Sequence, residues 1–320
     1  MKKYLLWALC IVISIPFFFS IWAFLRETAV AREIAPAHGA YAQAGDVQMY
    51  YQTAGDASDR IVILIHGMAA WSETWRESID ALAADGWYVI ALDMPPFGFS
   101  DRPIDHSYWR VSQATRIDAL LDSLDISSAV VVAHSYGSRA AFEFAMRNPE
   151  RVKRLVVVDP ALNGIYREDA PLSPIVRGTL AAAPLRYALS ASTITNPLLA
   201  KKLLQIFMHQ KEAATSEVVA VYRAPGARFG STRDFGYWLA GFADGYDTGL
   251  SSDKTSYAAL KTRVDIIWGR EDTTTPLAQG EMLESYLPNA ELHVLDGLGH
   301  MPHIEAADTF NSLLVRILKN

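Results

Sequence analysis

The hydrophobic pattern alternates along most of the chain between short apolar runs and segments with helical periodicity. Short continuous apolar runs are typical of strands covered on both faces. We expect strands at 47–55, 60–66, 87–93, 129–134, 154–159, 263–269 and 290–296. We expect helices at 73–84, 108–124 and 139–149, from about Pro276, and at 306–318. This alternation predicts an α/β fold with a mostly parallel sheet and crossover helices.

The alternation stops between about residues 160 and 257, where helix-like pieces broken by Pro and Gly replace it. One of these pieces is 196–210. Because strands resume afterwards in the same style, we interpret 160–259 as a helical insertion. The core then consists of residues 34–159 and 260–320.

The N-terminus has a different pattern. Residues 4–25 carry no charge and follow Lys2 and Lys3. As a helix they would extend about 33 Å, enough to cross a bilayer. We therefore predict an uncleaved membrane anchor and linker at 1–33, with the main domain on the non-cytoplasmic, periplasmic side. The alternative is secretion after cleavage, since residues 29–31, Ala-Val-Ala, resemble a signal-peptidase site.

Composition excludes several classes of protein. The net charge is −6 and no basic cluster occurs, which argues against a nucleic-acid partner. The single cysteine, Cys10, rules out an intrachain disulfide and the usual zinc spacings. His300 and His303 have a spacing that suits a metal, but His300 has a better explanation below. We expect neither a metal nor an organic cofactor.

The run VVVAHSYGSRA, residues 130–140, places Ser135 directly after a buried strand. Ala133 and Gly137 flank it at two residues on each side. A sharp strand-to-helix turn needs such small neighbours and projects the serine above the carboxyl end of the sheet. A serine that merely caps the following helix is the simpler alternative.

Two further residues support a catalytic role for this serine. His300 lies in a Gly-rich loop after the last expected strand, and Asp272 follows the preceding strand. A serine hydroxyl needs a base and a group that orients the base. All three residues follow strands expected to be parallel, so one edge of the sheet would gather them. Backbone N–H groups of Met68 and Tyr136 are candidate donors to an oxyanion.

These motifs resemble the α/β-hydrolase fold family. HGMAAW, ALDMPPFGFSDRP, AHSYGS, WGREDTTTP and GLGHMPH occur in the family's order, and the resemblance covers about residues 40–318. It implies an eight-stranded, mostly parallel sheet with a cap domain inserted after the sixth strand. By position, Ser135 would be the nucleophile, His300 the base and Asp272 the acid, with Met68 and Tyr136 as oxyanion donors. Ala133 departs from the usual G-x-S-x-G pattern.

Other polar residues near these motifs have structural explanations. Asp159 ends the sixth strand, where some members of the family keep the acid, but Asp272 fits the commoner arrangement. Asp93 is expected to hold a turn, and His303 to start the last helix, where capping or packing would explain it. For His66 and His134 we expect backbone organisation rather than catalysis.

The aromatic residues near the motifs have two possible roles. Core packing is the simpler expectation and lining of the pocket the alternative; the residues are Trp71, Trp75, Phe97 and Trp238.

The cap decides the substrate in this family. Segment 183–210 mixes apolar residues with Arg186, Lys201 and Lys202, so it fits a helix packed over the site or, less simply, one lying on a membrane surface. We expect a serine esterase whose substrate is a small-molecule acyl ester, such as a lipid or a monoacylglycerol-like ester, with the membrane as partner through the N-terminal helix.

Two main alternatives to the esterase remain, beside the peracid-forming relatives, which also keep a serine triad. Hydrolases of carbon–carbon bonds in ring-cleavage products also keep the serine, although many have Trp where this chain has Met301. The other alternative is a non-catalytic binding module with the same fold. Relatives that use an aspartate nucleophile, the haloalkane dehalogenases and related epoxide hydrolases, are excluded by Ser135.

Overall fold

The computed structural model describes residues 2–56, 60–162, 164–166, 173–244 and 247–319, with only the backbone for 2–13 and 242–244. Eight strands form one sheet in the order β1-β2-β4-β3-β5-β6-β7-β8. The strands are β1 (Gly39–Ala44), β2 (Val47–Ala54), β3 (Ile61–Ile65), β4 (Tyr88–Leu92), β5 (Ala129–His134), β6 (Val152–Val158), β7 (Val264–Gly269) and β8 (Ala290–Leu295).

Strand directions confirm the mostly parallel sheet. β1 pairs antiparallel with β2, and β2 antiparallel with β4. All other pairs, from β4 through β8, are parallel. β1 was absent from the expected strands because its sequence, GAYAQA, has no apolar run.

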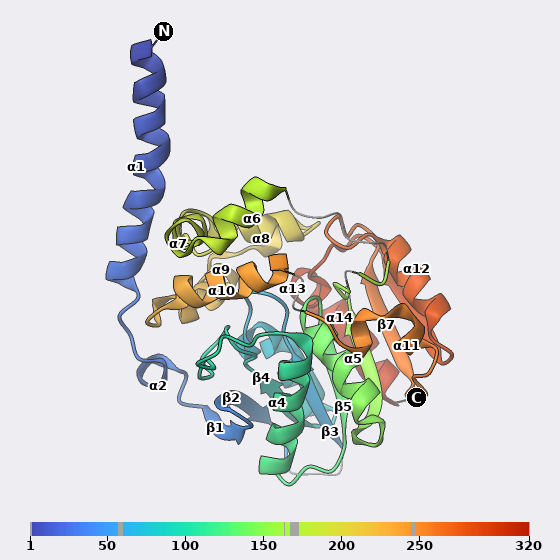
Figure 1. Cartoon of the computed structure of the whole chain (residues 1–320). Helices are drawn as coiled ribbons and strands as arrows, with labels where there is room; N and C mark the ends of the chain where they lie inside the picture. The colour runs from blue at the N-terminus through green and yellow to red at the C-terminus, as the bar shows by residue number, and fades with distance from the viewer. Residues whose placement is uncertain (1, 57–59, 163, 167–172, 245–246, 320) are drawn as a thin grey trace.

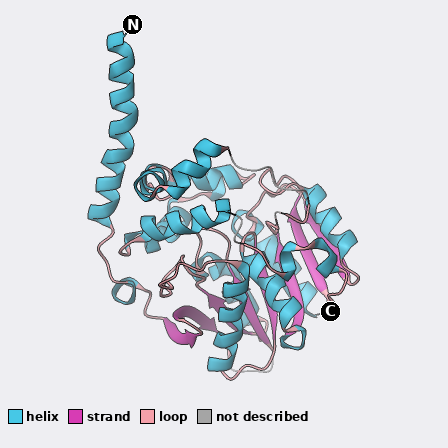
Figure 2. Ribbon diagram, viewed as in Figure 1, coloured by secondary structure: helices cyan, strands magenta, loops and turns pink. Residues whose placement is uncertain are grey.

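Helices cover both faces of the sheet (Figures 1 and 2). α3 (Arg76–Ala84) and α14 (Ala307–Lys319) pack on one face. α4 (Arg110–Ser123), α5 (Gly137–Arg147) and α12 (Leu277–Tyr286) pack on the other. Successive side chains of a strand point to opposite faces, so Val62 and Leu64 contact the first layer and Ile63 and Ile65 the second. Both layers are buried, which explains the continuous apolar runs.

A group of helices connects β6 to β7 and lies over the carboxyl edge of the sheet (Figure 1). We call residues 160–259 the cap. Its described helices of eight or more residues are α6 (Pro174–Ala181), α7 (Ala183–Ser192), α8 (Ala200–Phe207), α9 (Ser216–Arg223) and α10 (Ser231–Asp244). The short α11 (Lys254–Tyr257) returns the chain to the core, where the side chain of Tyr257 is buried against Phe142.

At the C-terminus the structure corrects one expectation. His303 lies in a separate short helix, α13 (Pro302–Glu305), and does not start the last helix.

The N-terminal helix α1 (Lys2–Arg26) packs against α7 and projects beyond the rest of the molecule (Figure 1). It is followed by the short α2 (Ala31–Ile34). Of the predicted membrane span, 4–25, the side chains of 4–13 lie outside the described part of the chain. Within the described residues, no helix has both the length and the apolar character needed to cross a membrane.

The segment after α1 is bonded to the cap. The buried carboxylate of Glu27 accepts a 2.9 Å hydrogen bond from the backbone N–H of Thr232 and a second bond from its hydroxyl. Ala29 donates to the carbonyl of Ala227 and accepts from the N–H of Phe229. Burial raises the pKa of Glu27 above its ordinary value, against the opposing effect of these hydrogen bonds. The N-terminal segment is therefore part of the folded body.

Candidate active site

Ser135 lies in the sharp turn between β5 and α5, in the left-handed region with φ of 49°. Non-glycine residues are uncommon there, and such strained positions cluster at functional sites. The small neighbours have a steric reason: a Cβ on Gly137 would lie 2.4 Å from the carbonyl oxygen of His66. Ala133, the departure from the family pattern, is completely buried. The turn thus holds the serine in one orientation at the carboxyl end of β5.

The structure brings Ser135, His300 and Asp272 together. Nε2 of His300 lies 2.8 Å from Oγ of Ser135, and Nδ1 lies 2.7 Å from Oδ2 of Asp272. His300 comes from the loop after β8 and Asp272 from the loop after β7. All three residues are buried. This geometry fits a nucleophile, a base and a group that orients the base.

Asp272 is held by the residues that follow it. Its Oδ1 accepts hydrogen bonds from the N–H groups of Thr274 and Thr275, and its Oδ2 accepts one from the Thr275 hydroxyl at 2.7 Å. The same hydroxyl lies 3.2 Å from Nδ1 of His300. Thr275 was not among the expected site residues. The signal in the sequence was the hydroxyl-rich run after the acid, TTT.

Asp159 lies beside Asp272 but does not contact His300 through a hydrogen bond. Its Oδ1 accepts from the N–H of Gly269 at 2.9 Å. Burial, and then the charge of Asp272, raise the pKa of Asp159 well above its ordinary value. The acid that orients His300 is therefore Asp272.

Two groups of side chains bring metal-ligand atoms within 4.8 Å of one another among the described residues: Asp159, Asp272 and His300, and Asp265, Glu291 and His293. In the first group, the His300–Asp272 hydrogen bond and the Thr275 hydroxyl occupy the ligand atoms. In the second, Asp265 pairs with Arg154 at 2.6 Å. In the first group, Oδ2 of Asp159 is buried and has no hydrogen-bond partner among the described residues.

Three other histidines lie around the site. His66 accepts a 2.9 Å hydrogen bond from the N–H of Met94, and Nε2 of His134 donates to the carbonyl of His300 at 2.7 Å. His303 packs against the ring of Trp75. Burial lowers the pKa of His66 to about 4 and that of His303 to about 3. It also lowers the pKa of His134 well below its usual value, with a contribution from His303. These three imidazoles are neutral at pH 7; His66 and His134 position the backbone, and His303 packs against aromatic rings.

A buried carboxylate fixes the loop that carries His300. Glu305 accepts hydrogen bonds from the N–H groups of Gly299 and Met301 in this loop, and from those of His209 and Gln210 in the cap. A carboxylate with this many backbone donors is well satisfied although it is buried. Glu305 was also missed from the sequence. Its place five residues after His300 was visible, but nothing in the sequence indicated its partners in the cap.

The expected oxyanion donors lie on either side of the serine. Met68 follows β3, and Tyr136 is the residue after Ser135. Neither backbone N–H donates a hydrogen bond to another group of the described residues. A Cβ on Gly67 would lie 3.2 Å from Cβ of Ser135, so only glycine lets this loop approach the serine closely. The two N–H groups are thus available to a substrate oxygen.

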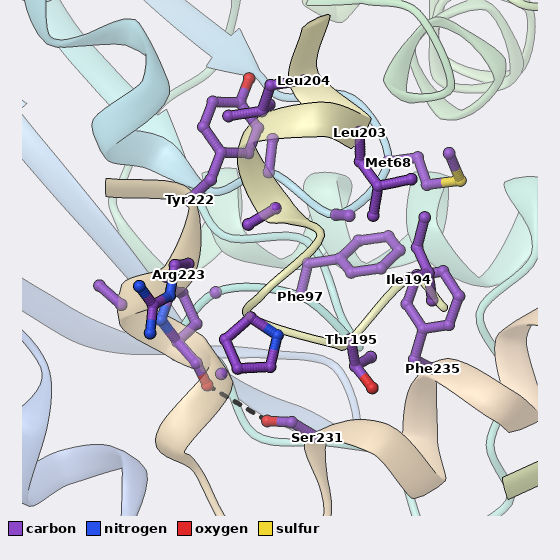
Figure 3. Close-up of a pocket in the computed structure, with 18 of the residues that line it drawn as sticks. Met68, Phe97, Ile194, Thr195, Leu203, Leu204, Tyr222, Arg223, Ser231 and Phe235 are labelled. Atoms are coloured by element: carbon purple, nitrogen blue, oxygen red, sulfur yellow. Dashed lines mark hydrogen bonds between the residues drawn. The ribbon is translucent and has the colours of Figure 1, made fainter. Parts of the chain in front are cut away.

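A cavity of about 580 Å³ opens at Ser135 and His300 beneath the cap. Its size is in the range of ordinary small-molecule sites. Figure 3 shows apolar side chains around the hollow, with Tyr222 and Arg223 of α9 at one side. The apolar lining comes from the core and the cap together: Met68, Phe97, Ile194, Leu203, Leu204, Phe207, Phe235 and Met301.

Among the expected aromatics, Phe97 lines this cavity. Trp75 is fully buried between the sheet and α14, and Trp238 packs against Phe97 and Tyr136. Trp71 is buried too and donates from Nε1 to the carbonyl of Val221 in the cap. Packing is therefore the role of the three tryptophans.

Comparison with known proteins agrees with this geometry. A family model described as alpha/beta hydrolase fold matches residues 60–307. The chain is 31% identical, over 79% of its length and 84% of the relative, to 2-hydroxymuconate semialdehyde hydrolase of Pseudomonas sp. (strain CF600). The solved meta-cleavage product hydrolase of Pseudomonas fluorescens IP01 has a TM-score of 0.72 and 28% identity, covering 88% of this chain and 97% of that one.

A solved membrane phospholipase A resembles the fold over the full length of both chains, with a TM-score of 0.69 and 20% identity. The sheet, the turn at Ser135 and the matched region all lead to one assignment. The chain belongs to the α/β-hydrolase fold family.

Proposed function

We propose that the chain is a serine hydrolase that cleaves carboxylic esters with an apolar acyl group. The observation that carries this proposal is the apolar cavity that opens at Ser135 and His300. An acyl chain in this cavity would bury its surface against Phe97, Leu204 and Phe207, at roughly 0.8 kcal/mol per CH₂ group.

The reaction follows from the geometry of the three polar residues. Oγ of Ser135 attacks the ester carbonyl while Nε2 of His300 takes its proton. The oxyanion is stabilised by the N–H groups of Met68 and Tyr136, each worth about 10²–10³ in rate. The C–O bond breaks as His300 gives its proton to the departing alcohol. Water, deprotonated by His300, then releases the acid and restores Ser135.

A second candidate is the hydrolysis of carbon–carbon bonds in ring-cleavage products. The observation that favours it is that several relatives, at 26–31% identity to this chain, are named as hydrolases of such compounds. One of them is named a 2-hydroxy-6-oxo-6-phenylhexa-2,4-dienoate hydrolase, from Burkholderia cepacia. A dienoate carries a carboxylate, which requires a cation or several donors in the cavity.

Two of the three arginines in the described lining are paired with carboxylates, whereas no ion pair joins Arg223 to a described residue. Arg26 pairs with Glu27 at 3.1 Å, and Arg102 pairs with Asp234 at 3.4 Å. Arg223 is exposed to solvent. The two partly shielded guanidinium groups of the lining are thus already neutralised by carboxylates.

The test compares both substrate classes on the same protein. Full-length protein is assayed with p-nitrophenyl esters of increasing acyl length and with 2-hydroxy-6-oxo-6-phenylhexa-2,4-dienoate, with Ser135→Ala as the control. We expect ester hydrolysis that rises with acyl length and is lost in the variant. Faster turnover of the dienoate than of every ester would establish the second candidate instead.

A fluorophosphonate probe adds a readout that does not depend on the substrate. We expect an adduct on Ser135, located by peptide mass spectrometry and absent from Ser135→Ala. A folded protein that is not labelled would leave the non-catalytic binding module as the better interpretation.

Localisation follows from the N-terminal sequence. Lys2 and Lys3 before the apolar residues 4–25 favour a cytoplasmic N-terminus, so we propose that the catalytic domain lies on the other side of the membrane. Protease added to intact spheroplasts would digest the domain in this orientation and spare it in the opposite one.

A further inference from the structure

The exposed large hydrophobic side chains of the described residues are unevenly distributed. With the exception of Ile104, all of them lie in the N-terminal segment up to Ile34 or in the cap. Those of the cap's first three helices and their connections are Ile175, Val176, Leu185, Leu189, Leu198, Leu199 and Ile206. Scattered exposed apolar residues need no explanation, but their concentration on one part of a molecule marks an interaction site.

The charge of the same part of the cap has one sign. Residues 171–210 contain no Asp or Glu, although the whole chain has a net charge of −6. Of the cations in this stretch, Arg186 is buried and donates to the carbonyl of Leu180. Arg177, Lys201 and Lys202 are exposed. A surface that combines exposed apolar side chains with uncompensated cations complements an anionic lipid surface.

Helix α8 connects this surface to the cavity. Its Leu203, Leu204 and Phe207 line the cavity, while Lys201, Lys202 and Ile206 are exposed. The helix is therefore the wall between the catalytic cavity and the outer face of the cap. An acyl chain taken up beside α8 has only this single layer to pass.

The position of α1 agrees with a lipid surface on the side of the cap's outer face. α1 packs against α7, and its exposed side chains include Phe17, Phe18, Phe24 and Leu25. Figure 1 shows that it projects beyond the body on the side where α6, α7 and α8 form the outer edge. A lipid surface met by α1 would also meet these three helices.

We infer that the outer face of α6, α7 and α8 docks on an anionic lipid bilayer and that the cavity receives acyl esters from it. Docking itself stands on the exposed apolar residues and the charge of this face. Delivery of an ester rests on the proposed function, so the two are tested separately.

Docking is tested with single-cysteine reporters in the full-length chain, after Cys10→Ser removes the native cysteine. Ile206→Cys and Leu185→Cys report on the face. Glu150→Cys, exposed at the amino end of β6 and so far from the cap edge, is the matched control. Each is labelled with a polarity-sensitive fluorophore. Vesicles contain phosphatidylcholine and phosphatidylglycerol, with a nitroxide quencher on the acyl chains.

Apolar faces of interfacial helices lie about 5–10 Å deep, so the labels at 206 and 185 should lose about half of their fluorescence. The label at 150 should be unaffected. Equal behaviour of all three labels would overturn the inference. A label at 206 that is already shielded from a water-soluble quencher without vesicles would overturn it as well, because a second copy of the chain would then cover the face.

Delivery is tested with the double variant Lys201→Glu/Lys202→Glu. On a short water-soluble ester its rate should equal that of the unchanged protein. On esters presented in anionic vesicles the rate should fall at least about tenfold. Each cation near an anionic surface contributes to binding, and replacing it with a carboxylate both removes this attraction and adds a repulsion of similar size. An equal loss on both substrates, or none on vesicles, would contradict delivery. If neither ester is cleaved by the unchanged protein, the proposed function fails while the fluorescence result still decides docking.

Discussion

The backbone N–H of His300 donates a 2.9 Å hydrogen bond to the carbonyl oxygen of Phe207. The first residue belongs to the catalytic loop and the second to the last turn of α8 in the cap. The cap therefore covers the candidate site and is also hydrogen-bonded to His300, the proposed base. We therefore expect a shift of α8 to be transmitted through this bond to the position of His300.

Replacement of Glu305 tests this coupling. Glu305→Gln places an amide N–H₂ group where the carboxylate accepts from the backbone N–H groups of both the loop and the cap. Leaving buried donors without an acceptor costs about 1–3 kcal/mol of unfolding free energy. Misplacement of a catalytic group by about 1 Å costs up to roughly 10²-fold in rate.

We expect Glu305→Gln to lower both the urea midpoint and kcat/KM. Glu281→Gln, on the exposed side of α12, is the control and should change neither. Unchanged activity in Glu305→Gln would mean that the loop does not need the cap for its position.

Thr275→Val removes the hydroxyl that donates to Oδ2 of Asp272. A hydrogen bond to a charged group is worth about 1.5–3 kcal/mol, so we expect kcat to fall roughly 10–100-fold. KM should stay the same, because Thr275 does not line the cavity. Thr275→Ser should restore most of kcat, and the exposed Thr273→Val should have no effect. A rise in KM without a fall in kcat would show that Thr275 acts on the substrate instead.

The two carboxyls beside His300 should differ strongly. Asp272→Asn replaces the acceptor of the 2.7 Å bond from Nδ1 and favours the wrong tautomer of the imidazole, a change that costs about 10⁴ in kcat in a serine triad. Asp159 accepts a hydrogen bond from Gly269 and makes none with His300, so Asp159→Asn should cost less than about tenfold. Steady-state rates on one ester distinguish them. Equal losses would mean that the two carboxyls share the catalytic role.

The sequence predicted the sheet and the three polar residues because both follow from local rules. Buried parallel strands appear as apolar runs, and the residues after their carboxyl ends gather at one edge, as Ser135, Asp272 and His300 do. β1 could not be predicted in the same way. Its strand exists through pairing with β2, and its own residues have no apolar period.

The supporting residues of the site depend on distant contacts that no short pattern contains. Glu305 is satisfied by His209 and Gln210, about 95 positions away in the sequence. Glu27 is satisfied by Thr232, 205 positions away. Such partners are set by how the cap packs on the core, which hydrophobic periodicity does not specify. Thr275 is the exception, since it bonds to a residue only three positions away.

The buried carboxyl of Asp93 should make the stability of the fold depend on pH. It is completely buried after β4, where it accepts hydrogen bonds from the N–H groups of Ser72 at 2.7 Å and Phe99 at 2.6 Å. Burial raises its pKa from 3.8 to about 6, against the opposing effect of these hydrogen bonds. The turn that it holds carries Phe97, which lines the cavity. The sequence had indicated this role, a turn residue beneath PPFGFSD.

The sign of the pH dependence follows from the raised pKa. The folded protein keeps this proton up to about pH 6, while the unfolded chain loses it near pH 3.8. Between these values the folded state binds more protons, so the stability contributed by protonated Asp93 is full at low pH and is lost as the pH rises to about 6. At about 1.4 kcal/mol per pKa unit, the loss is roughly 3 kcal/mol.

Asp93→Asn should remove this slope. The amide cannot ionise, and it leaves one of the two backbone donors without an acceptor, so the variant should be less stable at about pH 4 and lose less as the pH rises to about 7. Urea unfolding of the unchanged protein and of the variant across this pH range measures the difference between their two slopes. The comparison is needed because the raised pKa values of Asp159 and Glu27 contribute slopes of the same sign in both proteins. Two parallel curves of unfolding free energy against pH would show that Asp93 has the same pKa in the folded and the unfolded chain. The hydrogen bonds from Ser72 and Phe99 would then stabilise its carboxylate to the same extent as water does.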